Sequence, residues 1–238
     1  LDDLGYAVEW RVVNAAEYGF PQRRRRVFFL GYHKTSSIYK KIKKEAIDDW
    51  VLTDGVLSQS FPISQIPKSE KYFRIDDDIK SISDHFGTGL KVSEFQNSGV
   101  LIEGQIYTAK VNPNFDGSKS CLKDIIISND LVPAEYFIAD KDLDKWMYLK
   151  NGKNEIRKSS SGFEYKYSEG GMIFPDPLDK PSRTIITGEG GKSASRFKHV
   201  IKTAKGYRRL SPVELERLNM FPDNHTLFDG ISDTKRAF

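Results

Sequence analysis

One stretch near the start of the chain decides how the rest of the sequence is interpreted. Residues 14–26 are Asn14-Ala15-Ala16-Glu17-Tyr18-Gly19-Phe20-Pro21-Gln22-Arg23-Arg24-Arg25-Arg26. Gly19 and Pro21 break regular structure, which predicts a loop. The alternating apolar residues of 8–12 before it and the apolar run of 27–30 after it each predict a strand. A rigid loop would therefore hold four arginines at the edge of a sheet.

The composition is that of a folded protein with one thiol. The 238 residues are 38% hydrophobic and 29% charged with both signs present, which excludes a disordered or low-complexity chain. A single cysteine, Cys121, cannot form an intrachain disulfide, and this favours a reducing, cytoplasmic compartment. No apolar run approaches the ~18 residues of a membrane span, and no secretory signal opens the chain. We therefore expect no membrane partner.

The first strand is expected to be half buried. Val8, Trp10 and Val12 alternate with Glu9 and Arg11, and a period of two is typical of a strand with one solvated face. The run of residues 27–30 is expected to end at Gly31.

A lysine-rich segment follows at residues 34–44, where Ile38 and Ile42 lie four apart. This spacing predicts an exposed helix with a thin apolar stripe. A contact with a phosphate backbone is the alternative.

The middle of the chain is β-rich. The runs of residues 100–102, 106–111 and 125–127 are each expected to form a strand, because β-branched and aromatic residues are enriched there and turn residues separate them.

Two helices are expected towards the C-terminus. Asp140 is expected to cap the first, which Gly152 closes. Ser211-Pro212-Val213-Glu214 is a capping box with proline at the first helical position, so a second helix should begin at Pro212 and end by Pro222. Glu214 then has a structural role, and an ion pair with Arg217 on the same helix face is expected.

The arginine-rich loop resembles a known motif. Planar guanidinium groups suit phosphates or base carbonyls, and Gln22, Arg24 and Arg26 match the Gln-x-Arg-x-Arg motif of cytosine-5 DNA methyltransferases. The preceding Asn-Ala-x-x-Tyr-Gly-x-Pro also matches. A second block resembles the C-terminal motifs of the same family: Arg183-Thr184-Ile185-Ile186-Thr187, Gly190-Gly191, and Arg208-Arg209-Leu210-Ser211-Pro212-Val213-Glu214-Leu215-Glu216-Arg217. Two separated motifs in the right order argue against a chance match.

The resemblance implies an α+β fragment, namely an edge of an α/β methyltransferase domain joined to a smaller, mostly β target-recognition domain. Residues 1–34 would be the edge of the catalytic domain, 35–180 the target-recognition domain, and 181–238 the C-terminal motif region. The chain starts on Leu1 rather than Met and stops at Phe238 without a breaker. We therefore expect both ends to be cuts, the second just before the last family motif.

The resemblance also implies a reaction, which is methylation of carbon 5 of cytosine in double-stranded DNA by S-adenosylmethionine. The target base must be flipped out of the stack to be reached. In the family a cysteine thiolate adds to carbon 6 of the base and a glutamate bonds its N3 atom. Arg26 would hold the flipped cytosine at O2, and Arg24 would position the catalytic machinery or its phosphate. Gln22 completes the expected catalytic set.

The sequence departs from the family in three places. Cys121 lies in Ser-Cys-Leu rather than in the family's Pro-Cys-Gln, so it is not expected to be the nucleophile. Neither a Phe-x-Gly-x-Gly cofactor loop nor a Glu-Asn-Val motif is found. The S-adenosylmethionine site is thus expected in a missing N-terminal part, and the chain alone is expected to be inactive. Its four histidines lack metal-ligand spacing, so no metal is expected.

Other loop residues are candidates for DNA contacts, because arginine reads guanine edges and lysine meets phosphates. These candidates are Lys153, Arg157, Lys158, Gly190, Gly191, Lys192 and Arg196. The basic side chains could equally be solvated. The glycines would permit either a close backbone approach to DNA or a tight turn.

The leading interpretation is the recognition region of a bacterial-type cytosine-5 methyltransferase from a restriction-modification system. One alternative is a natural C-terminal subunit of a two-chain methyltransferase. The other is a DNA-binding module without catalysis.

Overall fold

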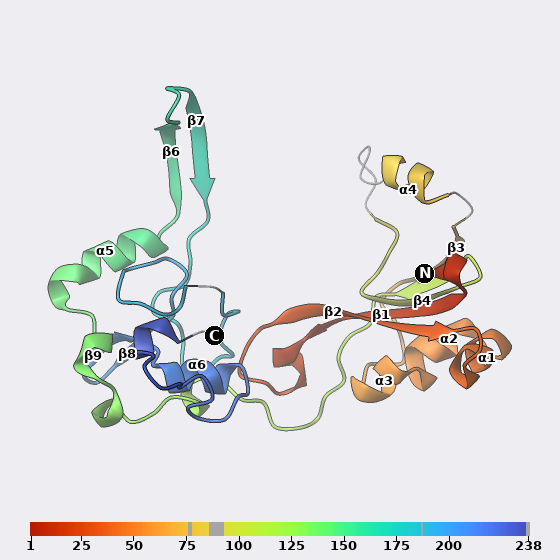
Figure 1. Ribbon diagram of the computed structural model, residues 1–238, viewed down its shortest axis with the longest axis horizontal. Helices are drawn as coiled ribbons and strands as arrows, with labels where there is room; N and C mark the ends of the chain where they lie inside the picture. The colour runs from red at the N-terminus through yellow and green to blue at the C-terminus, as the bar shows by residue number, and fades with distance from the viewer. Residues whose placement is uncertain (76–77, 86–92, 187, 237–238) are drawn as a thin grey trace. The chain divides into compact units, whose positions relative to one another are not determined.

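The computed structural model of the chain describes residues 1–75, 78–85, 93–186 and 188–236. Packing divides the chain into two compact units (Figure 1). Unit 1 comprises Leu1–Gly19 and Arg24–Ser118, and unit 2 comprises Phe20–Arg23 and Lys119–Phe238. The units are defined by packing, whereas the three expected regions are defined by motifs, so those regions stay a prediction. Thr187, the last residue of the Arg-Thr block, lies outside the described residues.

Unit 1 is built on a five-stranded antiparallel sheet with the strand order β2-β1-β4-β5-β3. The strands are β1 (Tyr6–Asn14), β2 (Arg25–His33), β3 (Glu70–Arg74), β4 (Ser98–Ile102) and β5 (Gln105–Ala109). The strands expected in residues 8–12, 27–30 and 100–102 are therefore confirmed, and the one expected in residues 106–111 is confirmed as far as Ala109. The mixture of helices with this sheet makes the fold a mixed α and β structure. The assignment to a domain edge stays a prediction.

Short helices cover the sheet of unit 1. They are α1 (Ser37–Lys44), α2 (Ile47–Asp49) and α3 (Val56–Ser60), with a π-turn over Trp50–Asp54. A further helix, α4 (Ile79–His85), lies between β3 and β4 in the chain, and none of its described side chains belongs to the buried core of this unit. The helix expected in the lysine-rich segment is confirmed as α1. Its Tyr39 and Ile42 are buried against the sheet, while Lys43 forms an exposed ion pair with Glu103.

The first strand is not half buried. Glu9 and Arg11 are each 1% exposed, which corrects the expected alternation. Arg11 donates hydrogen bonds to the carbonyls of Val51 at 2.6 Å, Leu57 at 3.1 Å and Phe61 at 3.1 Å. Val51 lies in the π-turn, Leu57 lies in α3, and Phe61 follows the last residue of α3, so one guanidinium joins two neighbouring helical segments to β1.

The buried carboxylate of Glu9 also has hydrogen-bond partners. Its carboxylate accepts from Tyr32 Oη at 2.7 Å, Trp50 Nε1 at 3.2 Å and Leu57 N at 3.1 Å. Burial raises the pKa of Glu9, and these hydrogen bonds act against that rise. Burial likewise lowers the pKa of Arg11, against the attraction of Glu9. A charged pair can thus occupy the covered face because the helices supply its polar partners.

Two other strand predictions need correction. β2 does not end at Gly31 but continues to His33, and Val27, Phe28 and Phe29 are exposed rather than buried. Residues 125–127 form no strand. Ile125 instead follows a 3-10 turn at Leu122–Asp124 and packs in the core of unit 2.

Unit 2 has helices α5 (Asp140–Lys150) and α6 (Pro212–Leu218) and two separate hairpins. One hairpin pairs β6 (Lys153–Lys158) with β7 (Glu164–Glu169), and the other pairs β8 (Val200–Thr203) with β9 (Gly206–Arg209). Further 3-10 turns of unit 2 lie at Asn129–Leu131, Ala134–Tyr136 and Asp233–Lys235, and those of unit 1 lie at Asp2–Leu4 and Ala15–Tyr18. No helix within the described ranges is both long and apolar enough to cross a membrane.

The helix ends of unit 2 match the sequence in part. The capping box before α6 is confirmed, because Ser211 N donates to Glu214 Oε2 at 2.7 Å and Glu214 N donates to Ser211 Oγ at 3.4 Å. However, α6 ends at Leu218, before Pro222 is reached. Asp140 is the first residue of α5 and not its cap, which is Ala139.

Glu214 has a different ion-pair partner from the one expected. Both of its carboxylate oxygens accept from Arg208 of β9 at 2.8 Å, and both side chains are 0% exposed. Arg217 pairs with Asp223 instead, at 2.7 Å. The capping geometry turns Glu214 back over the helix start, towards β9 and away from the next turn of α6.

The Arg11 guanidinium should hold unit 1 together. Arg11→Met leaves the buried Glu9 carboxyl group and three carbonyls without this partner. We expect the free energy of unfolding of unit 1 to fall by about 3 to 5 kcal/mol. Hydrogen exchange of the β1 and β4 amides measures this change. Lys40→Met, on the exposed face of α1, is the matched control, and equal exchange in both variants would contradict the assignment.

Candidate functional site

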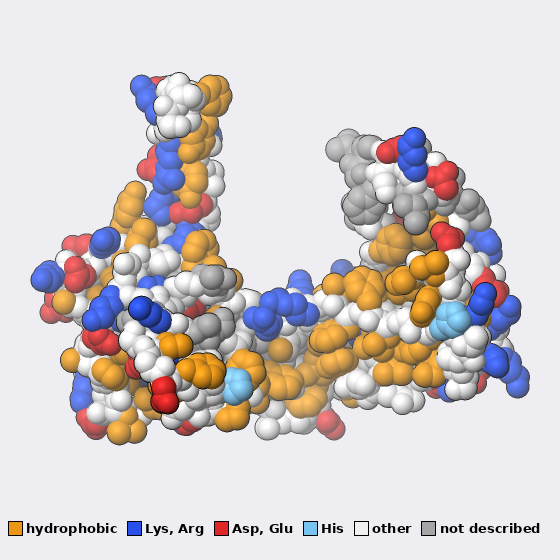
Figure 2. Space-filling view, in the orientation of Figure 1, with side chains coloured by type: hydrophobic (Ala, Val, Ile, Leu, Met, Phe, Trp, Pro, Cys, Tyr) orange, Lys and Arg blue, Asp and Glu red, His pale blue; other side chains and the backbone are white. Residues whose placement is uncertain are grey.

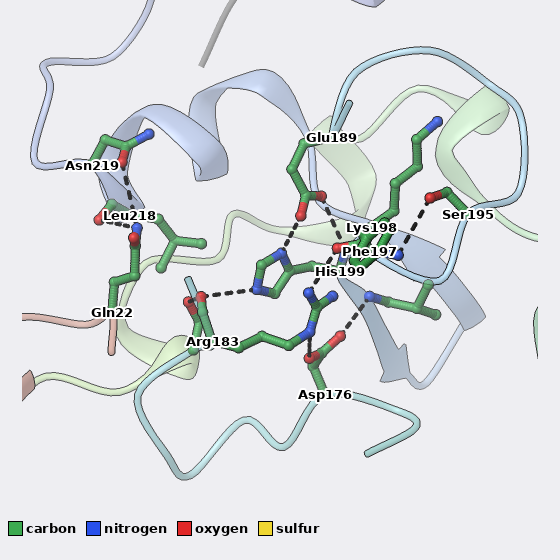
Figure 3. A network of polar contacts seen from close by, with 12 residues as sticks. Gln22, Asp176, Arg183, Glu189, Ser195, Phe197, Lys198, His199, Leu218 and Asn219 are labelled. Carbon is green, nitrogen blue, oxygen red and sulfur yellow. Dashed lines mark hydrogen bonds and ion pairs between the residues drawn. The ribbon is translucent and has the colours of Figure 1, made fainter. Parts of the chain in front are cut away.

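Gln22 joins the two motif blocks within unit 2. Its side chain is 2% exposed, and Nε2 donates to the carbonyl of Leu218 at 3.1 Å and to Asn219 Oδ1 at 3.4 Å, at the end of α6 (Figure 3). Its backbone forms a parallel bridge with Ser182. A glutamine from the first motif therefore anchors on the last element of the second.

The backbone around Gln22 reinforces this junction. Arg23 N donates to Ser182 O at 2.8 Å, and Ser182 N donates to Pro21 O at 2.7 Å. Thr184 Oγ1 donates to the carbonyl of Arg23. The Arg-Thr block thus lies directly beside Gln22 and Arg23, the start of the Gln-x-Arg-x-Arg block, although about 160 residues separate them in sequence. This contact is the geometry that the two motifs lead one to expect if they serve one site.

Arg24 and Arg26 lie where the loop enters β2, in unit 1. Ala15 N donates to the carbonyl of Arg24 at 3.1 Å, and Arg26 is opposite Val13 in the β1–β2 ladder. Burial lowers the pKa of Arg24, and the positive charge of Arg26 lowers it further. Arg26 Nη1 is exposed and donates to the carbonyl of Arg25 at 2.8 Å. Two neighbouring guanidinium groups form a site suited to an anion or to a carbonyl-rich ligand.

A buried polar network supports the Arg-Thr block (Figure 3). Arg183 Nε donates to Asp176 Oδ1 at 2.9 Å, and Val200 N donates to the other oxygen of Asp176 at 2.8 Å. His199 Nδ1 lies 2.6 Å from Glu189 Oε1, and His199 Nε2 lies 3.2 Å from the carbonyl of Arg183. No sequence pattern indicates this network, because its members lie 7 to 24 residues apart at no regular spacing and several of their partners are backbone atoms.

Two cations from neighbouring elements hold the Gly190–Gly191 loop. The carbonyl of Gly191 accepts from Lys198 Nζ at 2.9 Å and from Arg209 Nη1 at 2.5 Å. Lys198 also donates to Ser193 O at 2.8 Å, and burial lowers its pKa. Gly191 has a φ of 76°, which supports the tight-turn interpretation. A close approach of DNA to this loop stays a prediction.

Lys153 and Arg196 share one acidic partner. Lys153 Nζ lies 2.6 Å from Glu169 Oε1, and Arg196 pairs with the same carboxylate. The lysine side chain is 8% exposed and that of Arg196 is 15% exposed. The hydrogen bond from Lys153, followed by those of Tyr167 and Arg196, lowers the pKa of Glu169 to about 2. Both cations are engaged within unit 2.

Arg157 is also engaged. Its guanidinium lies 2.6 Å from Glu155 Oε1 and stacks 3.5 Å from the centre of the Tyr167 ring. The hydrogen bond to Glu155 raises the pKa of Arg157.

Lys158 and Lys192 are more open. Lys158 pairs with Glu164 at 3.0 Å and Lys192 with Glu135 at 2.6 Å, but their side chains are 70% and 66% exposed. Exposed pairs of this kind contribute little to stability, so both lysines could exchange partners.

Cys121 has the environment of an unreactive thiol. Burial raises its pKa, and the hydrogen bond to Asp124 raises it further. The thiolate is the nucleophilic form, so this position disfavours nucleophilic attack. Within the described residues, no group of three or more His, Cys, Asp or Glu side chains is arranged to hold a metal ion.

Comparison with known proteins identifies the class. The chain matches the C-5 cytosine-specific DNA methylase family over residues 1–238 and belongs to that family. It is 40% identical over 240 residues to Type II methyltransferase M.Sau3AI of Staphylococcus aureus, covering 100% of this chain and 55% of that protein. It therefore spans about half the length of this relative.

Shorter similarities point to the same class. Type II methyltransferase M.MthTI of Methanothermobacter thermautotrophicus is 39% identical over 54 residues, covering 23% of this chain and 16% of that protein. Type II methyltransferase M.NgoBV of Neisseria gonorrhoeae is 33% identical over 84 residues, covering 30% of this chain and 18% of that protein. The family resemblance is confirmed, whereas the roles of single residues stay predictions.

The junction at Gln22 should be sensitive to charge. Gln22→Glu replaces a buried donor with an acceptor that faces the carbonyl of Leu218 and Oδ1 of Asn219. We expect unit 2 to lose about 1 to 3 kcal/mol of stability, seen as faster hydrogen exchange at the amides of Arg23 and Ser182. Gln59→Glu makes the same change at an exposed amide and should leave this exchange unaltered. Protection that survives in Gln22→Glu would remove Gln22 from this role.

Proposed function

We propose that this chain is the DNA-recognition and base-positioning part of a DNA (cytosine-5-)-methyltransferase. The observation that carries the proposal is the junction of the two motif blocks, where Gln22 bonds the end of α6 and Arg23 bonds Ser182 and Thr184. The family membership supplies the reaction class, which is methyl transfer from S-adenosylmethionine to carbon 5 of cytosine. The substrate is duplex DNA from which the target cytosine is flipped.

The two arginines would have different tasks. Arg26 would donate from its guanidinium to O2 of the flipped cytosine, releasing its bond to the carbonyl of Arg25. A cation at O2 stabilises the negative charge that develops on the ring when a nucleophile adds to it. Arg24, which is more buried, would position the catalytic machinery or hold its phosphate.

The nucleophile and the cofactor site would lie elsewhere in the enzyme. Cys121 has a raised thiol pKa and lies outside a Pro-Cys-Gln context. A pocket of 190 Å³ in unit 2 is lined by Arg23, Arg183 and Asp176 among others. Its two guanidinium groups suit the carboxylate of S-adenosylmethionine but repel its sulfonium and ammonium, and Asp176 is already paired with Arg183, so we do not assign the cofactor to this pocket. When bound, that cofactor supplies the methyl group.

The remaining regions would present the enzyme to DNA. Residues 35–180 would form the target-recognition domain between an edge of the catalytic domain in 1–34 and the motif region in 181–238. The name Type II methyltransferase of M.Sau3AI supports a place in a restriction-modification system. Among the candidate contacts, the exposed Lys158 and Lys192 are the better suited to phosphates, because their ion pairs are solvated.

Methyl transfer should require a second segment. The purified chain, incubated with duplex DNA and labelled S-adenosylmethionine, is expected to transfer no label. Adding a polypeptide that carries Pro-Cys-Gln and the cofactor motifs should restore transfer. Cys121→Ser should leave the restored rate unchanged. Label transferred by the chain alone would refute this division of the chemistry.

DNA binding should separate the two arginines. Affinity should fall with salt, with a slope of about −0.9 per phosphate contact on logarithmic axes. Arg24→Ala should make this slope shallower by about 1 if Arg24 holds a phosphate. Arg26→Ala should keep the slope but lower kcat of the reconstituted enzyme about 10²- to 10³-fold. Affinity that stays flat from low to physiological salt would count against DNA as the partner.

A further inference from the structure

The β6–β7 hairpin forms a two-stranded sheet of its own. It leaves the end of α5 as a lone ribbon (Figure 1), and no third strand among the described residues pairs with it. In the space-filling view it carries basic and apolar side chains along its length (Figure 2). An isolated hairpin is at best marginally stable in water. The side chains on its two faces therefore show which face stabilises the hairpin and which is available to a ligand.

One face of the ribbon is occupied with its own contacts. Alternation places these residues on it: Lys153, Glu155, Arg157, Tyr165, Tyr167 and Glu169. Lys153 pairs across the strands with Glu169, Arg157 pairs with Glu155, and Arg157 stacks on Tyr167. Arg196 joins Glu169 from outside the hairpin. This face, which we call the paired face, holds the two strands together and ties them to unit 2.

The opposite face is different. It carries Asn154, Ile156, Lys158, Glu164, Lys166 and Ser168, all of them exposed. Lys158 and Glu164 pair beside the turn. The side chains of Asn154, Ile156, Lys166 and Ser168 make no hydrogen bond or ion pair with any residue that the structure describes. These four side chains form two adjacent cross-strand pairs, Asn154 with Ser168 and Ile156 with Lys166. We call the part of the face formed by these four residues the open face.

We propose that the β6–β7 ribbon enters the major groove of DNA with its open face towards the base edges. This rests on the proposed function, because duplex DNA is the ligand. The major groove is wide enough for a two-stranded β-ribbon. The open face offers an amide, which suits adenine, an ammonium, which suits guanine, and a hydroxyl, which suits either. Ile156, 73% exposed, offers an apolar contact for the methyl group of thymine.

The chemistry of the open face favours DNA over a protein partner. Three of its four unengaged side chains are polar, and the apolar contribution is the single residue Ile156. A docking surface for a protein usually has a contiguous apolar centre depleted of charge. Here Lys166 stands directly opposite Ile156. The paired face meanwhile keeps the ribbon folded, so the open face can be given to a ligand without loss of the hairpin's own contacts.

None of the three basic residues in this hairpin that the sequence singles out belongs to the open face. Lys153 and Arg157 were candidates for DNA contacts, but both lie on the paired face and are engaged there. Asn154 and Lys166 would instead discriminate between base pairs. The ribbon would then read sequence through residues that no motif identifies.

The test uses the 238-residue chain and a double variant, Asn154→Ala with Lys166→Gln. The matched control, Lys141→Gln, removes the same charge from an exposed position at the start of α5. Each protein is used to select bound sequences from a pool of randomised duplexes. Dissociation constants are then measured for the sequence selected by the unaltered chain and for a random duplex. Circular dichroism and thermal unfolding show whether each variant is folded.

We expect the double variant to lose about 5- to 150-fold in preference for the selected sequence, while its affinity for random duplex falls no further than in Lys141→Gln. Replacing purine N7 atoms of the selected site with carbon removes acceptors found only in the major groove. This should weaken binding by the unaltered chain but add little to the loss in the double variant.

Three results would overturn the proposal. If the double variant selects the same sequence with the same preference, the ribbon does not read bases, although the proposed function stands. If N7 replacement is without effect at every purine of the site, the ribbon does not lie in the major groove. If the unaltered chain binds no duplex at all, the proposed function and the ribbon proposal both fail.

Discussion

The buried amide of Gln22 is the constraint on which the functional part of the structure depends. A glutamine that is 2% exposed must find acceptors for its amide hydrogens, and it finds them at the end of α6, where helical carbonyls lack partners. The amide of Gln22 thereby gains an acceptor, and the carbonyl of Leu218 gains a donor. Because the capping box and the Arg208–Glu214 pair fix the start of α6 against β9, the first motif is held on an element that is itself rigid.

Local signals in the sequence were sufficient for elements with short-range causes. Ser211 and Glu214 lie three residues apart, so their capping box can be recognised from the sequence alone, as can the amphipathic pattern of α1. The burial of Glu9 and Arg11 was not predictable, since their partners are backbone carbonyls and side chains some 20 to 50 residues away. Arg208 is only six residues from Glu214, but it lies on β9 rather than on α6, so a rule about spacing within one helix selected Arg217 instead.

The candidate site was predictable to the extent that motifs carry it. Resemblance identified the family and singled out Gln22, Arg24 and Arg26, but only the fold places the first block beside Ser182 and Thr184. Basic residues were harder to judge. The sequence does not show which counter-ion a lysine or arginine will meet. Strand register gives Lys153 its partner Glu169, and a loop brings Arg196 to the same carboxylate. Arg157 pairs with Glu155 two residues earlier on its own strand.

The carboxylate of Glu169 has a consequence for the conditions under which the protein can work. It holds Lys153 and Arg196 at the base of the ribbon, and its pKa is about 2, below the ordinary value of 4.5. A depressed carboxyl pKa contributes stability that is present above the ordinary value and is lost only as the pH falls towards the lowered one. The ion pairs at the base of the ribbon are therefore fully formed near neutral pH, so in that range the ionic strength around the protein, rather than its proton concentration, should govern how the ribbon engages a charged polymer.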